Sequence, residues 1–271
     1  MTILLTGATG LVGARLLPRL LDAGLDCRAL IRGSGYTQAG ATTVLGDLFA
    51  DASLVDAVQG ITAVVHLAAS FRTLDTDLVW RSNLDGTRNL VAAVRINAPE
   101  ARFIMASTTN VYGANSVHPG REEDTVAPEA AYPASKLAAE QTLRDSGLNW
   151  SILRLGFVYG DGDGHLEDLP KHVPRFGWHP AQRMSTVHHR DVATAVLIAL
   201  RGGMDRRTVN IVDDAPLSIY ELVTLAGGNM EPSAALLENP WNMQADGTLA
   251  RSLGFQPVVR TIYQAVAQGL L

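Results

Sequence analysis

The stretch "TILLTGATGLVGARLL", residues 2–17, predicts how the chain begins to fold. An apolar run at 2–6 is followed by Gly7, Gly10 and Gly13, and then by a helical pattern. Glycines at such a junction allow a tight turn, a close approach of the backbone to a pyrophosphate, and a helix packed closely on the strand. The spacing is not G-x-G-x-x-G, so a plain strand-to-helix turn is the alternative. Its place at the first strand-helix junction favours dinucleotide binding.

The composition is that of a globular protein with a small-molecule partner. Of the 271 residues, 47% are hydrophobic, which is enough for a continuous core, and a net charge of -5 offers no general attraction to nucleic acid or anionic lipid. No apolar run is long enough to span a membrane, and Met1 leads into the first apolar run without room for a secretion signal. Cys27 is the only cysteine, so no internal disulfide can form. These features predict a cytoplasmic location, with no nucleic acid and no membrane among the partners.

Short apolar runs alternate with helical patterns through most of the chain. Near-continuous apolar strands separated by helices imply a parallel sheet that is covered on both faces. We therefore expect an α/β fold with a doubly wound, Rossmann-like parallel sheet. The expected strands are 2–6, 27–31, 42–47, 63–69, 102–107, 151–155 and 208–212, and the expected helices include 11–24, 84–96, the segment around Tyr132, 190–202, 218–226 and 259–270.

The texture of the sequence changes after Val158, where glycine, aspartate, histidine and proline dominate residues 161–187. We interpret this segment as an excursion from the sheet core, and we expect the last part of the chain to join it in a second lobe. The predicted domains are a dinucleotide-binding domain, 1–160 with 188–212, and a small substrate-binding lobe, 161–187 with 213–271.

The end of the second strand bears on the choice of nicotinamide cofactor. An acid there would accept from the ribose 2′-OH and repel a 2′-phosphate, but this strand ends with Ile31 and is followed by Arg32. A guanidinium suits a phosphate, which favours NADP, while a surface arginine without a ligand leaves NAD open. At the end of the third strand, Asp47 and Leu48 are candidates to flank the adenine.

The segment "AAYPASKLAAEQ", 130–141, places Tyr132 four residues before Lys136, so both side chains share one helix face. A phenol with a pKa of about 10 is a poor base near neutrality, but a neighbouring ammonium and a cationic nicotinamide ring both favour the phenolate. Such pairs also occur by chance, and an aromatic side chain at a helix start often packs in a core. The hydroxyls of residues 107–109, Ser-Thr-Thr, follow the fifth strand and complete a proton-transfer set, which favours catalysis.

Nine motifs together resemble the short-chain dehydrogenase/reductase superfamily, in its extended branch of NAD-dependent epimerases and dehydratases. They run along nearly the whole chain, and their combination is specific. The motifs are "TGATGLVG" (6–13), "GDL" (46–48), "HLAA" (66–69), "NLDGT" (83–87), "STTNVYG" (107–113), "YPASK" (132–136), "LRLGFVYG" (153–160), "VHHRDVA" (187–193) and "LARSLGFQP" (249–257).

The resemblance implies roles for individual residues. Tyr132 would be the acid/base, Lys136 its activator and a ligand of the ribose, and Thr108 the hydroxyl that positions the substrate carbonyl. Asn83 would support the site from the adjoining helix, and Ala68 would lie beside the cofactor. The full set expected at the cofactor is Gly7, Thr9, Gly10, Leu11, Val12, Gly13, Arg32, Asp47, Leu48, Leu67, Ala68, Ala69, Tyr132, Lys136, Leu155 and Phe157.

Departures from the family pattern narrow the reaction. Dehydratases of the branch carry an acidic pair directly after the hydroxyl residue, whereas this chain has Thr109 and Asn110, which disfavours dehydration. Sugar-nucleotide epimerases place an asparagine and an arginine at the diphosphate, whereas this chain has Phe157 and Met184 there, with Arg183 one residue away. A diphosphate would lose two natural partners. The pocket is therefore expected to suit a less charged carbonyl compound or a smaller sugar.

Three other patterns are set aside. The segment "DGDGHLED", 161–168, alternates oxygen donors like a calcium loop, but His165 replaces the third oxygen ligand. Five histidines, from His165 onward, lack a zinc-ligand spacing, and Pro170, Pro174 and Pro180 are expected to break any helix between them. A hydrolytic serine would need a G-x-S-x-G context, which is missing. We expect no bound metal.

The expected function is hydride transfer between NADP or NAD and a small-molecule carbonyl or hydroxyl substrate, with a sugar derivative among the candidates. One alternative is a nucleotide-sugar epimerase that retains its NAD, and a second is a non-catalytic NADP sensor that binds a partner protein. Net consumption of NADPH by added carbonyl compounds would separate the reductase from the epimerase. The proton-transfer set of Thr108, Tyr132 and Lys136 argues against a sensor. The resemblance leaves a homodimer open.

Overall fold

A parallel sheet of seven strands forms the centre of the computed structural model, which describes residues 1–33, 35–36, 38–71, 73–113 and 116–271. The strands lie in the order β10-β6-β5-β4-β1-β2-β3, and each neighbouring pair is parallel. The prediction of a doubly wound α/β fold is confirmed. The strands are β1 (Thr2–Thr6), β2 (Asp26–Ile31), β3 (Thr42–Leu45), β4 (Ala63–His66), β5 (Arg102–Thr108), β6 (Asn149–Leu155) and β10 (Arg207–Ile211).

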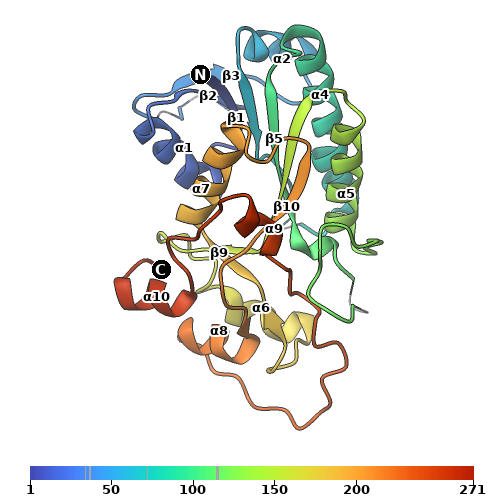
Figure 1. The fold of residues 1–271 in the computed structure, drawn as a ribbon, viewed down its shortest axis with the longest axis vertical. Helices are drawn as coiled ribbons and strands as arrows, with labels where there is room; N and C mark the ends of the chain where they lie inside the picture. The colour runs from blue at the N-terminus through green and yellow to red at the C-terminus, as the bar shows by residue number, and fades with distance from the viewer. Residues whose placement is uncertain (34, 37, 72, 114–115) are drawn as a thin grey trace.

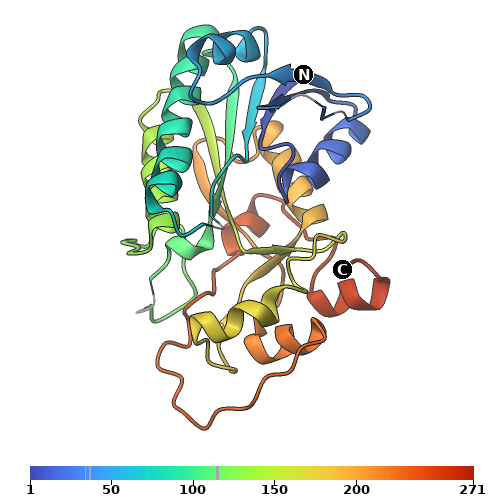
Figure 2. The ribbon, with the colours of Figure 1, turned by 180° about the vertical axis from the view of Figure 1, so that it is seen from behind.

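Two layers of helices cover the sheet, one on each face (Figures 1 and 2). Successive side chains of a strand point to opposite faces: Ile3 and Leu5 of β1 pack in one apolar cluster, while Leu4 packs in the other. The first cluster is covered by α1 (Gly13–Asp22), α7 (His189–Leu200) and α9 (Thr248–Ser252), and the second by α2 (Asp51–Val58), α4 (Gly86–Asn97) and α5 (Ala131–Arg144). Burial on both faces explains why the strands read as continuous apolar runs.

The strand order reverses between β1 and β4, whose last residues are Thr6 and His66. In open sheets of this kind, ligands bind in the crevice outside the carboxyl ends of the strands at the point of reversal. The topology therefore marks the turn after β1 and the segment after β4 as the place to look for a site.

A third apolar cluster lies beyond the carboxyl ends of the strands (Figure 1). Tyr159, Leu169, Leu222 and Ile262 are among its buried members. Its members come from β7 (Phe157–Tyr159), β8 (Arg183–Met184), β11 (Leu217–Ser218), α6 (Leu169–Phe176), α8 (Ile219–Leu225) and α10 (Ile262–Gln268). The strand β9 (Thr186–His188) pairs with β7, but its Val187 packs in the first cluster.

We retain the division into two domains, 1–160 with 188–212 and 161–187 with 213–271, as a proposal. The third cluster provides the second part with a core of its own. Ala250 and Phe255 are an exception to this division, because both pack in the first cluster under the sheet.

The prolines of the 161–187 segment were expected to break any helix, and this expectation is wrong for α6. Pro170 lies in the first turn of α6, where a missing N–H costs nothing because that group has no partner within the helix. Pro174 lies near the end of the helix, which closes at Gly177 with a φ of 60° and a hydrogen bond from the Gly177 N–H to the Val173 carbonyl of 3.0 Å. None of the helices among the described residues is long and apolar enough to cross a membrane.

Asp213 joins the lobe to the end of the sheet. It is 6% exposed, its Oδ2 accepts a hydrogen bond of 2.5 Å from the Thr186 hydroxyl, and its Oδ1 accepts one of 3.2 Å from the Ala215 N–H. Burial raises the pKa of Asp213 to about 7, although both hydrogen bonds oppose the rise. Because the folded-state pKa lies above that of an unfolded aspartate, about 3.9, the folded protein holds a proton that the unfolded chain releases.

We predict that this linkage makes stability fall as pH rises from about 4 through about 7. Asp213→Asn imitates the protonated carboxyl. The free energy of unfolding of the variant relative to that of the parent should therefore rise by roughly 1–4 kcal/mol between about pH 5 and about pH 8. Urea unfolding at the two pH values measures the change. Asp214→Asn is the control: Arg260 and Arg251 hold the pKa of Asp214 below its usual value against the effect of burial, so this variant should be less stable than the parent at both pH values. A difference between Asp213→Asn and the parent that does not vary with pH would contradict the prediction.

Candidate active site

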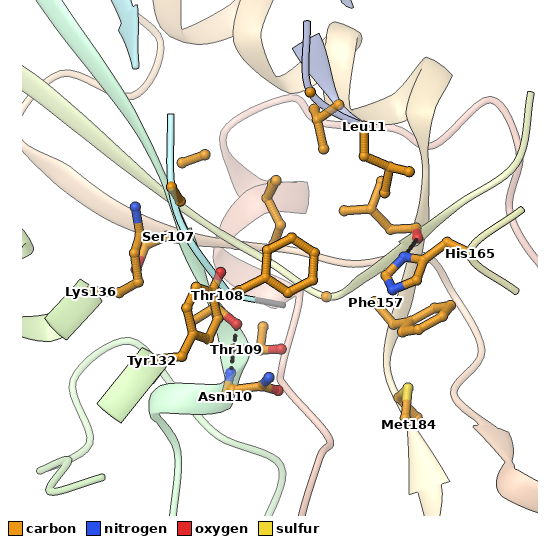
Figure 3. A pocket seen from close by; sticks show the side chains of 18 of the residues that line it. Leu11, Ser107, Thr108, Thr109, Asn110, Tyr132, Lys136, Phe157, His165 and Met184 are labelled. Atoms are coloured by element: carbon orange, nitrogen blue, oxygen red, sulfur yellow. Dashed lines mark hydrogen bonds between the residues drawn. The ribbon is translucent and has the colours of Figure 1, made fainter. Parts of the chain in front are cut away.

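A cavity of about 700 Å³ lies between the carboxyl ends of the strands and the lobe (Figure 3). It reaches from the turn after β1, past the ends of β4, β5 and β6, to the side chains of α6 and β8. The cavity therefore occupies the crevice that the strand order marks. The predicted site residues that line it are Gly7, Gly10, Leu11, Val12, Gly13, Leu67, Ala69, Thr108, Tyr132, Lys136, Leu155 and Phe157.

The glycine turn is packed so closely that side chains are excluded. A Cβ on Gly13 would lie 2.1 Å from the Gly7 carbonyl oxygen, and a Cβ on Gly7, which has a φ of 73°, would lie 2.7 Å from the Ala68 N atom. No side chain among the described residues caps α1, and its first turn carries no acid. The positive end of the helix and the backbone of the turn therefore face the cavity, which fits the pyrophosphate of a dinucleotide.

A buried chain of hydrogen bonds runs from the turn after β1 to the helix that follows β4. Thr87 Oγ1 donates to the Asn83 carbonyl over 2.6 Å, so it accepts from His66 Nε2, 2.9 Å away. His66 Nδ1 then accepts from the Thr6 hydroxyl over 2.6 Å, and Thr6 Oγ1 accepts from the Ala68 N–H over 3.3 Å. Burial lowers the pKa of His66 to about 3, with Lys136 adding to the effect, so the imidazole stays neutral.

Asn83 links the segment after β4 to the helix that carries Tyr132. It belongs to η1 (Arg81–Asp85), a π-helical turn between α3 (Thr76–Trp80) and α4. Its amide accepts from the Ser70 N–H over 2.8 Å and donates to the Ser70 carbonyl and to Ser135 Oγ, both over 3.0 Å. Ser135 Oγ in turn donates to the Tyr132 carbonyl over 2.8 Å. Asn83 thus holds the start of α5 from behind and does not line the cavity.

Tyr132 and Lys136 project from α5, and Thr108 lies beside the phenol at the end of β5 (Figure 3). Burial raises the pKa of Tyr132 to about 12, and a hydrogen bond with Thr108 opposes the rise. Burial lowers the pKa of Lys136 to about 8, and the nearby Glu140 carboxylate opposes that fall. The expectation that Lys136 and a cationic nicotinamide ring together favour the phenolate stays a prediction.

A buried ion pair between Glu140 and Arg154 joins α5 to the sheet. Glu140, one turn after Lys136, is fully buried and accepts from Arg154 Nε and Nη2 over 3.0 and 2.8 Å, from Ser107 Oγ over 2.5 Å, and from Arg144 over 2.7 Å. Burial by itself would raise the pKa of Glu140, but these partners bring it below its ordinary value. The carboxylate therefore fixes α5 against β5 and β6 and supplies negative charge beside Lys136.

Several predicted residues do not line the cavity as the described residues define it. Thr9 is exposed in the turn, and Ala68 lies behind Gly7. Arg32 is exposed just after β2. Asp47 accepts from the Phe49 N–H over 2.9 Å, and Leu48 packs in the second apolar cluster. The proposed cofactor contacts of these residues remain predictions.

The sequence interpretation missed several residues that the structure brings to the site. His66 lies within the quoted "HLAA" motif, which could have drawn attention to it. Glu140 lies four residues after Lys136, so helical spacing places both on one face of the helix. Phe71 and His165 line the cavity from loops, and no periodic pattern marks them. His66 and Glu140 support the site from behind, and Phe71 and His165 form part of the cavity wall.

Asp161 and Asp163 of the 161–168 segment contact basic side chains. Asp161 lies 2.7 Å from Arg19 and 3.6 Å from Arg190, and Asp163 lies 2.7 Å from His189 in a pair that is almost fully buried. Asp163 also accepts from the His165 N–H over 2.8 Å. Within the described part of the chain, no three His, Cys, Asp or Glu residues form a group that could hold a metal. The loop that carries His165 is fixed by these pairs.

Comparisons with known proteins agree with this geometry. The model of the NAD dependent epimerase/dehydratase family matches residues 3–211. The chain is 29% identical over 247 residues to a 4-hydroxy-2-methyl-3-oxo-4-farnesyl-3,4-dihydroquinoline-1-oxide ketoreductase of Stigmatella aurantiaca, which covers 83% of the chain and 72% of the relative. It is 33% identical over 174 residues to a UDP-glucose 4-epimerase of Vibrio cholerae, covering 59% and 53%. The solved structure of MoeE5 in complex with UDP-glucuronic acid and NAD superposes with a TM-score of 0.82 at 25% identity, covering 98% and 97%.

We predict that Gly13→Ala disrupts the turn, because the added methyl must displace the Gly7 carbonyl. Overpacking of this kind costs about 1–3 kcal/mol, and the shifted turn should no longer bind a pyrophosphate. Thermal unfolding with and without NADPH measures both effects. Gly113→Ala is the matched control, since a Cβ there meets nothing within 4 Å. A Gly13→Ala protein with the parent's melting point and the parent's NADPH-induced rise would disprove the steric argument.

Proposed function

Since this chain belongs to the NAD-dependent epimerase/dehydratase family, we propose that its net reaction is hydride transfer between a nicotinamide cofactor and a carbonyl or hydroxyl substrate, with the cofactor consumed. The family and the relatives are NAD(P)-dependent oxidoreductases and epimerases. The chain is therefore an enzyme of this type. One observation carries the proposal: a hydroxyl, a phenol and an amine line the same cavity as the glycine turn.

The three side chains have separate tasks in the proposed reaction. Thr108 and Tyr132 would hydrogen-bond the substrate oxygen and hold its carbon toward the nicotinamide. The Asn110 N–H donates to Thr108 Oγ1 over 3.1 Å, which leaves the Thr108 hydrogen to point toward the phenol or the substrate. Lys136 would bind the ribose with its amine. The bound nicotinamide supplies or receives the hydride.

The pKa values suit a protein that keeps Tyr132 protonated until the substrate oxygen becomes basic. With a pKa of about 12, the phenol is a proton donor at neutral pH. A carbonyl oxygen that gains negative charge during reduction would draw that proton from Tyr132. In the oxidative direction, the positive charges of Lys136 and of the oxidised nicotinamide would favour the phenolate.

We propose NADP as the preferred cofactor, with NAD as the alternative. The support is the exposed guanidinium of Arg32 directly after β2, where the adenosine ribose of a dinucleotide lies in folds of this type. The solved structure named above contains NAD, and this is a property of that protein.

A nucleotide-sugar epimerase is the second candidate, favoured by the similarity to the UDP-glucose 4-epimerase. The apolar side chains of Phe157 and Met184 in the cavity favour a reductase, because they offer nothing to a diphosphate. The name of the Stigmatella relative gives it a ketoreductase activity on a farnesylated ring compound, which agrees with an apolar cavity. A cytoplasmic location, supported by the single Cys27, and a homodimer stay predictions.

We predict that Tyr132→Phe lowers kcat/KM for carbonyl reduction by about 100-fold or more, because a positioned proton donor contributes roughly 10²–10⁴-fold. Binding of NADPH should survive, so the melting point should still rise when it is added. Tyr220→Phe is the control, since this exposed tyrosine of α8 is remote from the proposed chemistry. Full turnover by Tyr132→Phe would refute the assignment of the proton donor.

We also predict that Arg32→Glu reverses the cofactor preference. In the parent, NADPH should raise the melting point more than NADH at equal concentration, and the acid in the variant should repel the 2′-phosphate. Arg95→Glu makes the same change of charge at an exposed position in α4 and controls for net charge. A larger rise with NADH in the parent would show that Arg32 does not select NADP.

A further inference from the structure

The two ends of the cavity differ in chemistry. The end beside the sheet carries the glycine turn and the polar groups of Thr108, Tyr132 and Lys136. The end beside the lobe is lined mainly by aromatic and thioether side chains, namely Phe157, Phe176, Trp178, Met184 and Met243. A ligand that spans the cavity thus meets polar groups at one end and an apolar wall at the other.

Aromatic rings form a continuous series between these two ends. The centroid of the Phe71 ring lies 5.7 Å from that of Tyr132 and 6.5 Å from that of His165. His165 stacks on Phe157 with centroids 4.2 Å apart and an interplanar angle of 25°. A hydrogen bond of 2.8 Å between His165 Nδ1 and the Val158 carbonyl holds the imidazole in this position (Figure 3). The series leads directly away from the proposed proton donor.

The charges at the lobe end of the cavity do not suit a substrate that carries a diphosphate. Among the described residues that line it, no aspartate or glutamate occurs, and the cations are Lys136 at the sheet end and Arg175 at the rim. Arg175 lies on α6, is exposed, and has its guanidinium carbon 5.7 Å from the centre of the Phe176 ring. Met184, by contrast, is 6% exposed and lies in the wall itself. A doubly charged group in this wall would lose its hydration without gaining partners.

From this arrangement we infer the substrate class: a carbonyl compound whose body is a planar, apolar ring system of aromatic character, without a diphosphate. The carbonyl lies at Thr108 and Tyr132, and the ring system extends along Phe71 toward His165 and Phe157. Offset or edge-to-face contacts between rings favour such a ligand beyond the area it buries. The position of the reacting carbonyl rests on the proposed function. The apolar slot, by which we mean the part of the cavity beside Phe71, His165 and Phe157, depends only on the contacts between these rings.

The test compares three probes: the bicyclic aromatic ketone α-tetralone, the small polar ketone dihydroxyacetone, and UDP-glucose. NADPH oxidation gives kcat/KM for the two ketones. Binding is followed separately by the quenching of tryptophan fluorescence, with Trp178→Phe identifying the signal from the cavity. We expect kcat/KM for α-tetralone to exceed that for dihydroxyacetone by at least tenfold, and α-tetralone to bind at least tenfold more tightly than UDP-glucose.

Phe71→Ser tests the wall at a position where folding is not at risk, because this side chain is 45% exposed. The dissociation constant for α-tetralone should rise about three- to tenfold, and Phe71→Tyr should restore the parent's value. Met184→Gln tests the buried part of the wall and should weaken α-tetralone binding, with Met184→Leu as the control that keeps the wall apolar.

The outcomes separate the slot from the reaction. Tighter binding of UDP-glucose than of α-tetralone, or α-tetralone binding that is unaffected by Phe71→Ser, overturns the inferred substrate class even if NADPH is oxidised. Saturable, Trp178-dependent binding of α-tetralone with no oxidation of NADPH by either ketone supports the slot and refutes the proposed hydride transfer.

Discussion

The site depends on the close contact between the turn after β1 and the segment after β4. Gly7 brings the backbone of the turn against Ala68 with no room for a side chain, and Gly13 brings the start of α1 equally close to Gly7. A hydrogen bond between Thr6 and His66 holds the two strand ends together. Because β1 and β4 flank the point where the strand order reverses, this contact sets the floor of the crevice. The same chain of hydrogen bonds continues to Asn83 and Ser135, so the glycine turn and the start of α5 are connected through it.

The charge of Lys136 is a balance between two opposing effects. Burial disfavours the ammonium, and the buried carboxylate of Glu140 favours it. Glu140 can carry that charge in the interior because Arg154 pairs with both of its oxygens. Buried ion pairs of this kind add little to stability once desolvation is counted. Their value here is positional, since they place a fixed negative charge one helical turn from Lys136.

Much of the fold could be predicted from the sequence because a parallel sheet covered on both faces needs continuous apolar strands. The run at 2–6 forms β1, and the other expected strands fall close to their observed bounds. The helix α6 could not be predicted by counting prolines, because the effect of a proline depends on its place in the helix.

The raised pKa of Tyr132 follows from burial, which spacing along a helix does not reveal. Phe71 and His165 meet only through the tertiary fold, so local pattern could not place them in one wall.

The π-helical turn that carries Asn83 has a consequence for insertions and deletions. The segments α3, η1 and α4 follow one another without a break, and a π-helical turn corresponds to one extra residue within an α-helix. Loss of a single residue from η1 would restore the regular repeat with α3 and α4 in nearly the same relative orientation, but it would remove the widened turn from which Asn83 is presented. The Asn83 amide could then no longer reach both Ser70 and Ser135. The length of this helical segment is therefore constrained as strictly as the identity of the residue it presents.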